Sequence, residues 1–147
     1  MLVTHGTGAE LHARPMAIAG VDENLELWFV SNEDSAKVHE IEQDTHAHVI
    51  CQRDQSAYLS LGGTASLVKD RARVEKLWSE SFRVWFPEGA ADPELVLIRF
   101  RPERAEFWDN RGFHKMAYIW DAARAYVTGT KPGVRESAHG VVALTQT

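Results

Sequence analysis

Residues 12–41 constrain the fold of this 147-residue chain most strongly, because they predict several structural elements in a fixed order. Two apolar runs, 13–19 and 25–30, flank a turn-rich segment at 20–24. After a polar interruption, residues 36–41 continue with the apolar spacing of a helix. This order predicts strand, turn, strand, loop and helix.

The junction between the second of these strands and the helix carries residue types that bind anions. A phosphate site at such a junction needs hydroxyl donors, a cation and free backbone N–H groups at the start of the helix. Ser35, Lys37 and the first amides of the helix can supply them, and Arg14 can reach in from the neighbouring strand. The alternative is that Asp34 or Ser35 only caps the helix.

The rest of the chain is also rich in strand-like segments that are separated by short turns. Apolar and alternating patterns predict further strands at 1–4, 11–19, 47–52, 57–68 and 95–100, the last continued at 104–108. Six or so strands with short turns and only peripheral helices indicate a mostly β fold. They favour a small antiparallel barrel over a parallel sheet.

Individual positions within these elements can be predicted as well. The helix over 35–43 is expected to turn Val38 and Ile41 inward and to leave Glu40 in solvent. The paired glycines at 62–63 lie in the middle of a predicted strand. Such glycines indicate a bulge or the close approach of another backbone.

Composition bounds the partners and the compartment. A net charge of -5 argues against nucleic acid as a partner, because neutralising phosphates needs a basic face. No apolar run reaches membrane-spanning length, and residues 1–4 lack the pattern of a signal peptide. The single cysteine, Cys51, excludes an internal disulfide and fits a reducing cytosol, so a cytoplasmic protein is expected.

The length fits a single domain, which we assign to residues 1–129. Residues 130–147 have little to bury and are expected to form a mobile tail. Two apolar stretches, 82–86 and a stripe of helical period at 116–127, are more than one small barrel can easily cover. They favour a dimer.

Motifs of common enzyme classes give little support. His46 and His48 share a face of a predicted strand, but no third ligand of suitable type recurs nearby, so no metal site is predicted. Neither a Gly-x-Ser-x-Gly elbow nor a Walker loop occurs, and no catalytic residue is assigned. Trp85 and Trp108 lie at loop or strand-end positions, where an aromatic ring can cover a planar ligand such as an isoalloxazine or simply anchor a loop.

An ordered set of short motifs spans residues 1–108. It comprises Ala13-Arg14-Pro15-Met16, Leu27 to Asn32, Ser35-x-Lys37, Gly62 with Ala65, Asp70-Arg71, Trp78, Trp85-Phe86-Pro87-x-Gly89, Asp92-Pro93 and Phe107-Trp108-Asp109. In this set the sequence resembles the flavin-binding general stress proteins of the pyridoxamine 5′-phosphate oxidase-like superfamily. The resemblance implies a split β-barrel of antiparallel Greek-key type that forms a homodimer. FMN, or FAD as an alternative, would lie in two clefts at the dimer interface.

The resemblance also implies roles for individual residues. Arg14 and Lys37 would pair with the flavin phosphate, and Ser35 would hydrogen-bond it. Backbone and side-chain atoms along the ribityl chain and ring would come from Pro15, Met16, Val30 and Ser31. Trp108 falls near the position where related oxidases use a tryptophan of the partner subunit.

Departures from the family pattern narrow the function. Ala19 stands where pyridoxamine phosphate oxidases carry a lysine, and Ala57 stands where they place a glutamine beside the flavin. Their C-terminal arginine–histidine substrate motif has no counterpart after Trp108. The flavin half of the site is therefore present and the vitamin-phosphate half absent, which argues against pyridoxal phosphate synthesis. An opening directly on a strand predicts that an N-terminal element of longer relatives is missing.

The expected function is that of a general stress-type flavoprotein with a redox role through its bound flavin. The sequence does not decide whether the protein is an enzyme. A non-catalytic protein that stores or senses flavin is one alternative. An oxidase of another small substrate is the second.

Overall fold

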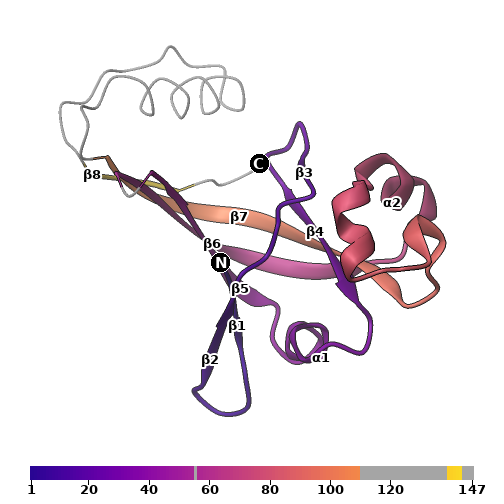
Figure 1. Cartoon of the computed structure of the whole chain (residues 1–147). Helices are drawn as coiled ribbons and strands as arrows, with labels where there is room; N and C mark the ends of the chain where they lie inside the picture. Colours follow the sequence, from indigo (N-terminus) through magenta and orange to yellow (C-terminus); the bar gives the residue numbers. More distant parts are fainter. Residues whose placement is uncertain (55, 110–138, 144–147) are drawn as a thin grey trace.

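One antiparallel sheet organises the computed structural model, which describes residues 1–54, 56–109 and 139–143 (Figure 1). Its strands are β1 (Leu2–His5), β2 (Leu11–Arg14), β3 (Gly20–Val21), β4 (Leu27–Asn32), β5 (His46–Arg53), β6 (Ala57–Val68), β7 (Leu95–Asp109) and β8 (His139–Ala143). Neighbouring strands follow the order β2-β1-β5-β6-β7-β4-β3, and β8 pairs with β7. Every pairing is antiparallel, as the sequence predicts.

Short helices occupy the periphery. Helix α1 (Ala36–Gln43) follows β4, and α2 (Arg71–Leu77) follows β6, where Asp70 caps it by accepting a hydrogen bond from the Arg73 N–H. Two 3₁₀ turns, η1 (Glu80–Val84) and η2 (Gly89–Ala91), lead from α2 into β7. Figure 1 shows α2 and these turns beside β4. The predicted fold class, mostly β with peripheral helices, is confirmed.

Strand β4 is buried on both faces. Leu27 and Phe29 belong to the main core, together with Val38 and Ile41 of α1, which point inward as predicted. Trp28 belongs to a second apolar cluster, which α2 and η1 complete. The sequence predicts one face more apolar than the other, but the helical segment 71–84 covers the outer face as well.

The paired glycines of β6 mark a close approach of two backbones, as predicted. The register between β6 and β7 shifts between Gly62 and Gly63. A Cβ atom on Gly63 would lie 2.0 Å from the carbonyl oxygen of Arg101. Only glycine fits at this bulge without a backbone shift.

One expected boundary, the end of the strand predicted over 11–19, is wrong. The strand predicted over 11–19 ends at Arg14, because Pro15 has no N–H to donate to a ladder, and pairing resumes only where the Ala19 N–H donates to the carbonyl of Trp28 (2.8 Å). Residues 139–143, within the expected C-terminal tail, form strand β8, whose backbone pairs with the outer part of β7. The apolar stripe at 116–127 lies outside the described residues.

Candidate functional site

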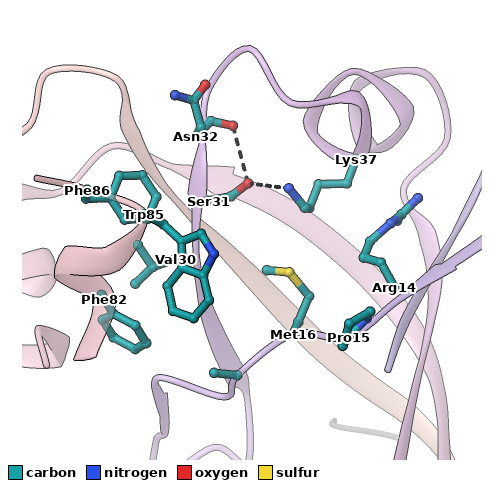
Figure 2. Close-up of a pocket in the computed structure, with 11 residues that line it drawn as sticks. Arg14, Pro15, Met16, Val30, Ser31, Asn32, Lys37, Phe82, Trp85 and Phe86 are labelled. Carbon is teal, nitrogen blue, oxygen red and sulfur yellow. Dashed lines mark hydrogen bonds between the residues drawn. The ribbon is translucent and has the colours of Figure 1, made fainter.

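A cavity of about 470 Å³ opens between the segment that follows β2, the C-terminal half of β4, the first turn of α1 and the loop around η1. Its lining residues are Arg14, Pro15, Met16, Ala17, Val30, Ser31, Asn32, Lys37, Phe82, Trp85 and Phe86 (Figure 2). Polar side chains gather at the α1 side and aromatic side chains at the η1 side. The cavity therefore has a polar end and an aromatic end.

The polar end centres on the hydroxyl of Ser31, the last buried residue of β4. Lys37 Nζ donates to Ser31 Oγ at 3.2 Å, and Ser31 Oγ lies 3.0 Å from Ser35 Oγ. Ser35 occupies the N-cap position of α1, but its side chain makes no capping hydrogen bond, so its hydroxyl is directed to Ser31 instead. The alternative that Ser35 only caps the helix is thus not what the geometry shows.

The ammonium of Lys37 is poorly compensated. Burial, assisted by the positive charge of Arg14, lowers the pKa of Lys37 despite the opposing effect of Glu40. Within the described part of the chain, no carboxylate forms an ion pair with Lys37. A cation held in this way favours an incoming anion.

Arg14 is held differently from Lys37, although both line the cavity. Its Nη2 donates to Glu40 Oε2 at 2.8 Å, and its Nη1 donates to Thr4 Oγ1. Figure 2 shows its guanidinium directed away from Ser31, whereas the ammonium of Lys37 points toward that hydroxyl. The two cations predicted to act together are therefore not equivalent.

Glu40 corrects the prediction of a solvated side chain. It is only 9% exposed and receives hydrogen bonds from Arg14 and from the buried hydroxyl of Thr4, while His12 Nδ1 lies 2.5 Å from its second oxygen. Burial raises the pKa of Glu40, but the hydrogen bonds from His12, Thr4 and Arg14 outweigh it and lower that pKa. The hydrogen bonds from these three side chains, which pack against α1, offset the cost of burying the Glu40 carboxylate.

The aromatic end is built from one short segment. Phe82 and Phe86, four residues apart, are both buried, and the Phe86 N–H donates to the carbonyl of Phe82 at 3.0 Å. Trp85, between them, is 68% exposed at the edge of the cavity. Neither phenylalanine is among the predicted site residues, although their i, i+4 spacing within the apolar stretch 82–86 indicates a shared face.

The predicted site residues are mostly brought together. Those that line the cavity are Arg14, Pro15, Met16, Val30, Ser31 and Lys37. Ser35 contacts the cavity only through Ser31. Trp108 pairs with Tyr58, whereas Val30 pairs with Leu97, so Trp108 lies roughly 35 Å further along β7 at 3.3 Å per residue. It does not reach this cavity in its own chain.

No three candidate metal ligands converge anywhere in residues 1–54, 56–109 and 139–143. His46, one of the two histidines weighed as metal ligands, places Nδ1 2.7 Å from Asp44 Oδ1 instead. None of the described helices has the length and apolar character needed to cross a bilayer.

Comparisons with known proteins extend this picture. The solved neighbours share the split-barrel architecture, so the chain is a split β-barrel protein, as predicted. The family described as "pyridoxamine 5′-phosphate oxidase like" matches residues 1–133, and the chain belongs to that family.

General stress protein 26 of Bacillus anthracis is 26% identical, with a TM-score of 0.65 over 72% of this chain and 80% of that one. A Nostoc punctiforme protein described as pyridoxamine 5′-phosphate oxidase-related and FMN-binding is 18% identical, with a TM-score of 0.58 over 76% of this chain and 73% of that one. At that identity it supports the fold alone. Protein bli-3 of Neurospora crassa is 26% identical over 129 residues, 81% of this chain and 61% of that protein. The chain thus spans less than two thirds of that relative.

Proposed function

We propose that this protein binds FMN, with the phosphate at the polar end of the cavity and the rest of the flavin along its apolar walls. The observation that carries the proposal is the half-buried Lys37, whose ammonium donates to Ser31 Oγ and is paired with no described carboxylate. The cavity of about 470 Å³ falls within the range of small-molecule sites. Membership of the pyridoxamine 5′-phosphate oxidase-like family supports a flavin as the ligand.

The anchoring roles differ from residue to residue. Lys37 contacts the phosphate directly with charge-assisted hydrogen bonds. Ser31 and Ser35 supply hydroxyl donors beside it. Arg14 balances the negative charge of Glu40 and adds to the positive potential at the polar end of the cavity. It does not contact the phosphate directly, because two of its N–H groups already donate to Thr4 and Glu40. FAD is the alternative cofactor.

A bound flavin supplies hydride or electron transfer, and the protein's contribution is binding and orientation. We therefore propose a redox role of general stress type. A non-catalytic flavin store or sensor is the second candidate, favoured by the absence of an evident general acid or base among the lining residues. Reduction by NAD(P)H with steady-state turnover, measured from the flavin absorbance, favours the enzyme.

We also propose that the protein is a homodimer. Val84 and Trp85 are 79% and 68% exposed, which leaves apolar surface beside the cavity. In a dimer, Trp108 of one subunit would have the opportunity to approach the cavity of its partner. Light scattering of the flavin-loaded protein tests this, and a monomer mass with flavin still bound contradicts it.

The phosphate assignment is tested by measuring FMN and riboflavin against the wild type and Lys37→Ala. Loss of one charge-assisted contact should weaken FMN binding by about 10- to 100-fold, since each such bond is worth about 1.5–3 kcal/mol. Riboflavin, which lacks the phosphate, should bind both proteins almost equally. The melting temperature of the ligand-free protein should barely change.

Lys76→Ala is the matched control, because Lys76 is an exposed helical lysine outside the cavity. It should change neither affinity. Equal losses of riboflavin and FMN in Lys37→Ala would mean that Lys37 supports the pocket and does not bind phosphate. Absence of flavin binding by the wild type would overturn the proposed function itself.

A further inference from the structure

Trp85 is an aromatic side chain that the fold leaves uncovered at the edge of a cavity. It is 68% exposed, whereas its neighbours Phe82 and Phe86 are 8% and 6% exposed. Tryptophan is highly buried on average, because its large ring gains much from leaving water. An exposed tryptophan that lines a cavity is therefore a candidate for covering a ligand.

The backbone around Trp85 is fixed rather than loose. The Trp85 and Phe86 N–H groups both donate to the carbonyl of Phe82, at 2.9 and 3.0 Å, and the Gly89 N–H donates to the carbonyl of Phe86 at 3.0 Å. Arg83 pairs with Glu80 at 2.8 Å on the outer side of the same turn. Phe82 and Phe86 are both buried in the apolar cluster that α2 helps to form, so the backbone position from which the indole extends is fixed.

The opposite wall of the cavity is also apolar. Figure 2 shows the thioether of Met16 and the indole of Trp85 extending into the same space from two different elements, with Val30 of β4 beside the indole on the side away from Met16. Met16 packs against the main core, and this contact holds its side chain in place. A flat ring inserted between these two side chains would contact a polarisable sulfur on one side and an indole on the other.

We propose that Trp85 covers the ring of the bound flavin by stacking on the ring face opposite Met16. This inference rests on the proposed function and identifies the ring-binding residue of the same site. It assigns the role to a tryptophan of the same chain, from the loop after η1. Trp108 lies near the far end of β7 and does not reach this cavity in its own chain.

Ring stacking predicts a pattern of affinities that differs from phosphate binding. Trp85→Leu should weaken FMN, riboflavin and lumiflavin by a similar factor of about ten, because all three share the ring. Trp85→Phe keeps an aromatic face and should recover most of that affinity. Lys37→Ala, in contrast, should affect FMN alone.

The fluorescence of the bound flavin supplies a second, independent measurement. A stacked indole quenches flavin fluorescence by electron transfer, so flavin bound to the wild type should be dark. Flavin bound at saturation to Trp85→Leu or Trp85→Phe should be several-fold brighter, since neither leucine nor phenylalanine donates an electron as readily. Lys76→Ala, whose exposed lysine lies on α2 and does not line the cavity, should match the wild type in affinity and brightness.

The outcomes separate the two proposals. Unchanged affinity and quenching in Trp85→Leu, with FMN still bound, overturn the assignment of Trp85 and leave the proposed function standing. Relief of quenching by Trp108→Leu instead would assign the contact to that residue and overturn the inference. A wild-type protein that binds no flavin overturns both.

Discussion

Next to the polar end of the cavity, side chains from β1, β2 and α1 meet around Glu40, and Arg14 connects this group to the cavity. The aromatic end comes from the single run 82–86. The polar end depends on contacts between residues up to 36 positions apart in the sequence. The aromatic end depends on local backbone hydrogen bonds and one glycine. The polar end therefore forms only when distant elements pack together, whereas the backbone of the aromatic end is shaped mainly by the hydrogen bonds of its own turn.

This contrast predicts how each end fails. Disturbing the polar end should destabilise the whole domain, because a buried charge loses its partners. Disturbing the turn at the aromatic end should cost less stability and act mainly on ring binding. Three substitutions test these expectations, in order of decreasing effect.

The largest effect is expected for Glu40→Ala. Removing this carboxylate takes away the charged partner of Arg14 and the acceptor of the buried Thr4 hydroxyl, and breaking a buried pair typically costs about 3 kcal/mol or more. Urea denaturation measures the loss. Glu42→Ala, an exposed glutamate on the same helix, should stay within about 0.5 kcal/mol of the wild type. Equal stability of the two variants would refute the structural role of Glu40 and its hydrogen-bond partners.

A smaller effect is expected for Gly89→Ala in the turn that holds the aromatic end. Gly89 has a φ of 77°, a left-handed conformation that costs an alanine about 1–2 kcal/mol. Gly8, in the turn between β1 and β2, has a φ of 74° and a comparable penalty. Gly8→Ala is therefore the matched control for strain. Both should lose similar stability in urea, but only Gly89→Ala should weaken riboflavin binding, and equal riboflavin affinities would show that the turn does not position the ring site.

The smallest effect is expected for His12→Gln, and it should depend on pH. The hydrogen bond to Glu40 and the charge of that carboxylate raise the pKa of His12 above 6.5, with Glu10 adding to them and Arg14 opposing. A raised pKa in the folded state stabilises the protein below the unfolded value, and this contribution disappears as the pH rises through the folded value. Glu40 stays ionised in this window because its own pKa is lowered below 4.5.

Urea midpoints of the wild type and His12→Gln, compared from about pH 5.5 to about pH 8.5, measure this contribution. The wild type should be the more stable protein at the acidic end, and the difference should shrink toward the alkaline end. A difference that is constant with pH would mean that protonated His12 contributes no special stability.

Much of the architecture follows from local sequence patterns. The alternating and apolar runs predict the strands, Ser35 stands at the start of the predicted helix, and the glycine pair at 62–63 marks the bulge. These features depend on backbone conformation and on burial along one element, which neighbouring residues determine. The residue types and the strand–loop–helix order likewise predict an anion site with Arg14, Ser35 and Lys37, of which Arg14 and Lys37 line the cavity.

Contacts between distant elements were decided only by the tertiary structure. The pattern of α1 predicts a solvated Glu40, because its partners His12 and Arg14 lie on a strand more than 25 positions earlier. The exposure of Trp85 opposite Met16 depends on where η1 packs against β4, which no periodicity encodes. Local sequence determines which face of its own element a side chain occupies. The packing of the elements determines which charged or aromatic partner that side chain contacts. This packing pairs Arg14 with Glu40 and leaves Lys37 without an ion-pair partner among the described residues.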